Sequence, residues 1–127
     1  MSKEENYFFK HKFNALKHQM FLAIHSAEKA HNEVFSKPKN DRHEIAGVGF
    51  LTQASSYMSS AYSIYYSNLE LFEDSDAEEI FHAYFQFSDE LLKSFSENHS
   101  YQHTDIYFDE LIKAFKSSPF NSPITDE

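Results

Sequence analysis

The sequence of 127 residues has no cysteine and no tryptophan, and it contains only two glycines and three prolines. The absence of cysteine excludes disulfides, cysteine-ligated zinc sites and thiol chemistry. Valine and threonine are also scarce, with two and three residues. Strands favour these β-branched residues, and tight turns favour glycine and proline, so the composition predicts an all-α protein.

Positively charged residues are also scarce. Lysine and arginine together number 11 against 20 acidic residues, which gives a formal net charge of −9, and Arg42 is the one arginine in the sequence. Binding to nucleic acid draws on a cationic surface that neutralises phosphates. We therefore expect no direct nucleic-acid binding.

Long apolar runs are missing as well. No stretch of the sequence approaches the roughly 18 consecutive apolar residues that indicate a membrane span. Residues 1–10 are mostly polar and do not form the apolar stretch of a signal peptide. We expect a soluble protein of the cytoplasm that is not associated with a membrane.

The motifs of several enzyme classes are absent too. None of the 17 serines lies in a Gly-x-Ser-x-Gly elbow, and the sequence contains no Walker loop and no dinucleotide-binding fingerprint. We therefore expect a protein that is not an enzyme and that needs no cofactor.

Helical periodicity is what the sequence does contain. From Phe9 to Val34 apolar residues recur at alternating steps of four and three, which predicts a long helix that ends before Pro38. Capping residues precede further periodic stretches, for example Asp41 and Ser75. The predicted fold is one domain, an up-down bundle of four helices, two long, one medium and one short, over residues 5–36, 42–72, 76–96 and 105–116, with a flexible tail over 117–127.

The two glycines, Gly47 and Gly49, lie inside the second predicted helix. A glycine in a helix interior costs about 1 kcal/mol relative to alanine. Two explanations are open: the helix is broken at 47–49, or a neighbouring backbone approaches closely there.

The predicted fourth helix is much shorter than the first two. A helix of about 30 residues spans about 45 Å, whereas the fourth helix, with about 12 residues, spans about 18 Å. A single chain would leave apolar surface on the first two helices uncovered, and such surface on a soluble protein usually marks an interface. We expect a homodimer that buries a face of the first or second helix.

Charge is distributed unevenly along the chain. Residues 1–63 contain 8 basic and 6 acidic side chains, whereas residues 64–127 contain 3 basic and 14 acidic side chains. Six acidic residues concentrate around one turn between helices, and we call them the acidic cluster: Glu70, Glu73, Asp74, Asp76, Glu78 and Glu79. A solvated acidic face is one interpretation, and a surface that steers a basic partner is the other.

Tyrosine and serine alternate between Ser55 and Ser67. Tyrosine is favoured where one end of the side chain is buried and the other is in water. Helix packing, a dimer interface and a ligand pocket all remain open for this segment, whose candidate residues are Tyr57, Met58, Tyr62, Tyr65 and Tyr66.

Histidine and glutamate suggest a metal site only weakly. The pairs Glu28/His31 and Glu79/His82 have the Glu-x-x-His spacing found in di-iron helical bundles. In an up-down bundle, however, the two pairs would be displaced along the axis by about 13 Å. His99 and His103 are a third weak candidate pair, and we expect no bound metal.

Two functional hypotheses follow from these observations. The first is a non-enzymatic acidic helical protein that acts by binding a basic protein partner through its acidic C-terminal half. The alternative is a helical bundle that binds a small ligand or a metal with histidine, glutamate and tyrosine side chains facing a cavity between helices.

Overall fold

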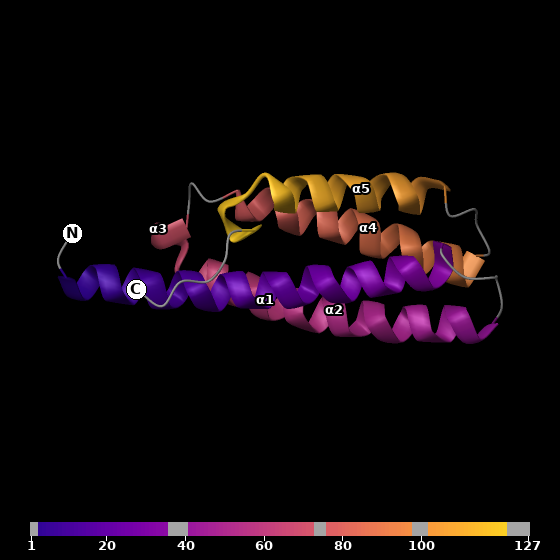
Figure 1. Cartoon of the computed structure of the whole chain (residues 1–127), viewed down its shortest axis with the longest axis horizontal. Coiled ribbons are helices and arrows are strands. Elements are labelled where there is room, and N and C mark those ends of the chain that lie inside the picture. The colour runs from indigo at the N-terminus through magenta and orange to yellow at the C-terminus, as the bar shows by residue number, and fades with distance from the viewer. Residues whose placement is uncertain (1–2, 36–40, 73–75, 98–101, 122–127) are drawn as a thin grey trace.

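The computed structural model describes residues 3–35, 41–72, 76–97 and 102–121 (Figure 1). Within these ranges the chain forms helices and no strands, so the predicted all-α class is confirmed. No helix in the described ranges is long and apolar enough to cross a bilayer. The elements are α1 (Lys3–Phe35), α2 (Asp41–Ser67), α3 (Leu69–Phe72), α4 (Ala77–Glu97), α5 (Gln102–Lys116) and the 3-10 turn η1 (Pro119–Asn121).

The four longer helices form two antiparallel hairpins, α1 with α2 and α4 with α5 (Figure 1). The hairpins meet where α2 contacts α4 and where α5 contacts α1. Each helix therefore contacts the next one around a ring. As a result, the α2–α4 seam and the α1–α5 seam lie on opposite sides of the molecule.

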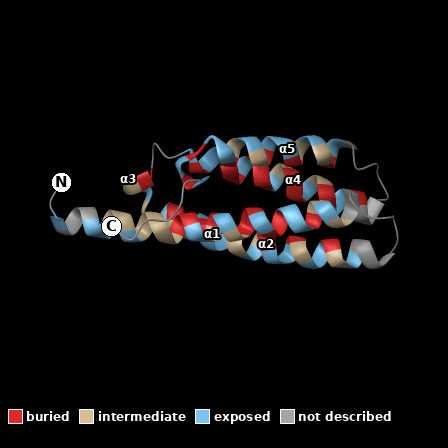
Figure 2. Cartoon of the chain, in the orientation of Figure 1, coloured by how far each residue is buried: buried red, intermediate tan, exposed pale blue. Residues whose placement is uncertain are grey.

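Small side chains line the contact between α1 and α2. Alanine occupies fully buried positions on both helices, which allows the two backbones to approach closely: Ala23, Ala27, Ala30, Ala54 and Ala61. Larger side chains fill the remainder of the core, including Leu16, Met58 and Tyr84. Buried residues, red in Figure 2, recur along all four of the longer helices.

The second predicted helix, 42–72, is divided at a different place from the glycines. Helix α2 is continuous through Gly47 and Gly49, because a cost of about 1 kcal/mol is too small to interrupt a helix packed along its length. The interruption lies at Asn68, whose backbone N–H donates to the Tyr65 carbonyl at 3.1 Å. Its side-chain amide donates to the Ile64 carbonyl at 2.9 Å, and such local bonds compete with helix propagation.

The N-terminal end of α1 is covered by two short elements. The Phe9 ring lies 6.1 Å from the Phe72 ring of α3, and the Phe13 ring stacks on the Phe120 ring of η1 at 5.2 Å. Both covering side chains are almost fully buried. They reduce the apolar surface that the difference in length between α1, with 33 residues, and α5, with 15, would otherwise expose.

The predicted flexible tail therefore needs correction over residues 117–121. The Ser118 hydroxyl donates to the Phe115 carbonyl at 2.6 Å and accepts from the Phe120 backbone N–H at 3.2 Å. Prolines at 119 and 123 suggested fraying, but the burial of Phe120 fixes the segment as far as Asn121. Residues 122–127 lie outside the described ranges.

Gly49 provides a test of the continuous helix. It is exposed, and a Cβ atom added there would meet nothing within 4 Å. Gly49→Ala should raise the free energy of unfolding by about 1 kcal/mol, because alanine gains helix propensity without a clash. Ser59→Ala, at another exposed position of α2, should gain roughly half as much. Urea unfolding followed by circular dichroism measures both, and a destabilised Gly49→Ala variant would contradict the continuous helix.

Phe120 provides a test of the ordered η1 segment. Phe120→Ala should lower the free energy of unfolding by about 3 kcal/mol, because it removes a buried ring and leaves a cavity against Phe13. Lys113→Ala is the control, since Lys113 is exposed on α5 and its loss should change stability by less than about 0.5 kcal/mol. Equal effects of the two substitutions in chemical denaturation would show that η1 is not packed on α1.

Candidate functional site

Three half-exposed aromatic side chains gather on the α2–α4 seam, and we call them the aromatic patch: Tyr62, Tyr66 and Phe85. Their exposed fractions are 43%, 45% and 50%. The Tyr62 ring lies 4.5 Å from the Tyr66 ring and 6.4 Å from the Phe85 ring. Leu92, at 47% exposure, follows Phe85 after seven residues on the same helix face.

The Tyr and Met candidates of the second predicted helix divide between core and surface. Met58 and Tyr65 are buried, and Tyr57 is half-buried against the core. Only Tyr62 and Tyr66 remain substantially exposed. The segment in which tyrosine and serine alternate is therefore a helix with one face packed in the core and one exposed aromatic face.

The aromatic patch is linked to the start of α4 by a hydrogen bond. The Tyr66 hydroxyl donates to Oε1 of Glu78 at 3.1 Å. Partial desolvation of the phenol, this hydrogen bond and the negative charge of the Glu78 carboxylate together raise the pKa of Tyr66 to about 12. Each of these effects disfavours the tyrosinate form.

A second hydroxyl pair joins α2 to α4 beneath the surface. The Ser55 and Tyr84 hydroxyls lie 2.6 Å apart, and Tyr84 is fully buried. Burial raises the pKa of Tyr84, while its hydrogen bonds with Ser55 and Ser88 offset part of that rise. The hydroxyl of a buried tyrosine needs such a partner, so this bond helps to set the register of α4 on α2.

The acidic cluster lies at the α3–α4 end of the aromatic patch. Glu70, Asp76, Glu78 and Glu79 are exposed, while Glu73 and Asp74 lie outside the described residues. Asp76 adopts a left-handed backbone with φ of 64°, directly before α4. Glu78 and Glu79 occupy the first turn of α4, where the helix dipole favours negative charge.

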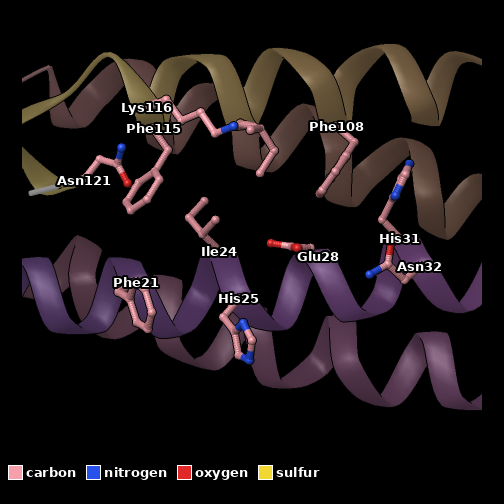
Figure 3. Close-up of a pocket in the computed structure, with 11 residues that line it drawn as sticks. Phe21, Ile24, His25, Glu28, His31, Asn32, Phe108, Phe115, Lys116 and Asn121 are labelled. Carbon is pink, nitrogen blue, oxygen red and sulfur yellow. The ribbon is translucent and has the colours of Figure 1, made fainter.

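A cleft of about 390 Å³ lies on the opposite seam, between α1 and α5 (Figure 3). Its apolar lining comes from both helices: Phe21, Ile24, Phe108, Ile112 and Phe115. Its polar lining includes one acidic and one lysine side chain: His25, Glu28, His31, Asn32, Lys116 and Asn121. In Figure 3 the side chains of Ile24 and Glu28 extend from α1 towards α5, whereas the His25 ring points away from α5.

His31 closes one end of this cleft. Its Nε2 atom lies 2.9 Å from Oδ1 of Asp105, and its ring stacks on Phe108 at a centroid distance of 3.9 Å. These two contacts join α1 to α5, and His31 and Asp105 are 74 positions apart in the sequence. His31 thus acts here as a link between the two hairpins.

The structure separates the weak metal candidates. Glu28 and His31 line the α1–α5 cleft, whereas Glu79 and His82 are exposed on α4. His103 is exposed, and His99 lies outside the described residues. Across the described ranges, no three histidine, aspartate or glutamate side chains come together as a metal ion would require.

Sequence reasoning did not identify the α5 side of the cleft. Phe108, Ile112 and Phe115 recur at steps of four and three, the spacing of one helix face, and this signal was present in the sequence. Phe108 and Phe115 also belong to the buried core. Asp105 lies in the first turn of α5 and contacts His31.

Comparisons with protein-family models, with curated proteins and with solved structures give no match for this chain. The functional argument therefore rests on the geometry of the two seams.

The Tyr66–Glu78 hydrogen bond predicts a late-titrating tyrosine. The phenol of Tyr66 should ionise near pH 12 in the folded protein, against about 10 in the unfolded chain. The folded state retains this proton while the unfolded state loses it, so the stabilising contribution of Tyr66 falls as pH rises from 10 to 12. Difference absorbance titration of the wild type against Tyr66→Phe isolates this phenol from the other tyrosines.

Glu78→Gln is the matching substitution, and it should lower the pKa of Tyr66 because it removes the carboxylate charge. Glu79→Gln, one residue further along α4, should leave this titration unchanged. A Tyr66 phenol that titrates at pH 10 in the wild type would contradict the hydrogen bond.

Proposed function

We propose that the protein is a non-enzymatic binding protein whose aromatic patch and acidic cluster together bind a basic protein partner. In this proposal α1, α2, α4 and α5 form an up-down bundle that holds the α2–α4 seam rigid. The observation that supports it is the placement of three half-exposed rings, with Tyr62 against both Tyr66 and Phe85, beside the exposed carboxylate of Glu78.

The two parts of this surface have complementary roles in binding. Aromatic rings supply a large contact area at a low cost in side-chain entropy, and tyrosine and phenylalanine are enriched at the centres of interfaces. Lysine and arginine side chains of a partner could stack on these rings, which favours a cationic ligand. The carboxylates at the end of the patch, and the net charge of −9, would increase the rate of encounter with a basic protein.

Affinity capture from extracts of the source cells, followed by binding measurements on the purified candidate, tests this proposal. Phe85→Ser should weaken binding by at least tenfold, the loss typical of removing a central aromatic contact. Phe21→Ser is the matched control, because Phe21 is exposed to a similar extent, 56%, but lies on the α1–α5 seam. Binding should also weaken as salt is raised. A partner that both variants bind equally, or whose binding does not depend on salt, would refute the proposal.

We further propose a homodimer, in which a face of α1 or α2 is buried. This is supported by large apolar side chains that remain exposed on both helices within the described ranges, above all Tyr7 at 75% on α1 and Ile45 at 72% on α2. Side chains of this type on a soluble protein commonly mark an interface.

Light scattering at tens of micromolar should give a mass of twice 14.9 kDa. Ile45→Ser or Tyr7→Ser should shift the mass towards the monomer, and the variant that does so identifies the buried face. A wild-type mass of 14.9 kDa would rule out the dimer.

A further inference from the structure

Two contacts hold the C-terminal part of the chain on α1, one on each side of the segment that contains the α1–α5 cleft. At one end His31 contacts Asp105 and stacks on Phe108. At the other end the Phe13 ring of α1 stacks on the Phe120 ring of η1. His31 follows Phe13 by 18 positions, or about 27 Å along α1, so these two contacts bound the segment that contains the cleft.

The walls of the cleft are largely apolar. Ile24 from α1 and Ile112 and Phe115 from α5 line its middle. The volume of about 390 Å³ lies within the range of about 300 to 1,000 Å³ typical of small-molecule sites. A ligand with an apolar body of several carbon atoms would cover these side chains.

Glu28 is the acidic group of the cleft. Its carboxylate extends from α1 into the space below α5, between Ile24 and His31 (Figure 3). Phe108 and Phe115 reach towards the same space from α5 (Figure 3). A carboxylate bordered by apolar and aromatic side chains favours a cationic group, which gains an ion pair and contact with the rings.

We propose that the α1–α5 cleft is a binding site for a small organic amine, with its ammonium group paired to Glu28 and its apolar body against Ile24, Ile112 and Phe115. The net charge of −9 favours the entry of cations over anions. This site does not depend on the proposed protein-binding surface, which lies on the opposite seam.

Lys116 provides the competing interpretation. It lines the α5 side of the same cleft, and in Figure 3 its side chain runs along α5. If Lys116 rather than Glu28 selected the ligand, the cleft would prefer a carboxylate. The experiment therefore compares ligands that differ only in charge.

Hexylamine, hexanol and hexanoate are suitable probes because they share one apolar body. Each is titrated into 15N-labelled protein at neutral pH while amide shifts are followed by NMR. Hexylamine should bind about fivefold more tightly than hexanol, the advantage of about 1 kcal/mol that a partly exposed ion pair provides. The largest shifts should fall on residues around Ile24, Glu28 and Ile112, and residues on the α2–α4 seam should not respond.

Glu28→Gln should abolish the preference for hexylamine over hexanol while leaving the affinity for hexanol unchanged. Glu79→Gln is the matched control, since it removes a carboxylate from the other Glu-x-x-His pair, outside the cleft. Both residues are exposed, so neither substitution should affect folding, which circular dichroism verifies. The proposal is overturned if hexanoate binds most tightly, if hexylamine has no advantage over hexanol, if no probe shifts the cleft residues, or if Glu28→Gln retains the preference.

Discussion

Close packing of α1 on α2 through alanine is the constraint on which the remaining structure depends. Ala23 and Ala27 on α1 and Ala54 on α2 are fully buried, so these helices pair with their backbones close together. Larger side chains of both hairpins complete the core, Leu16 and Met58 in the first and Phe81, Phe87 and Leu91 in the second. The seams between the hairpins are therefore lined by large side chains, and both candidate binding surfaces lie on these seams.

Polar contacts set how the two hairpins are aligned. Apolar contacts have no fixed direction, whereas a hydrogen bond between two helices is lost if one helix slides by a single residue. The Ser55–Tyr84 bond fixes α4 on α2, and the His31–Asp105 contact fixes α5 on α1. Within the second hairpin, the buried hydroxyls of Ser94 and Thr104 lie 3.2 Å apart. In the described residues no buried side-chain nitrogen or oxygen lacks a hydrogen-bond partner, so this alignment is compatible with pairing of the buried polar side chains.

Local periodicity was sufficient to predict the longer helices and insufficient to predict what covers them. The spacing of Phe9, Phe13 and Leu16 identifies α1 because it reflects the helix repeat itself. Phe72 is the last residue of the second predicted helix and Phe120 follows Pro119, and their burial depends on contact with residues about 60 and 107 positions earlier in the chain. The same limit applies to the cleft. Glu28 and His31 were recognised as a pair, but the groups opposite them come from α5, and no local pattern indicates that α5 packs there.

The negative charge of the chain would affect binding at both seams. Half-exposed rings such as Phe85 and Phe21 could contact many different molecules, and a net charge of −9 repels those that are acidic. A neutral competitor is neither repelled nor attracted by this charge. A basic partner at Glu78 and an amine at Glu28 would instead be attracted by the negative charge. In each case the electrostatic attraction would act beside the apolar contacts of the ligand. The sign of the charge would then restrict which ligands can use the apolar surface that both seams expose.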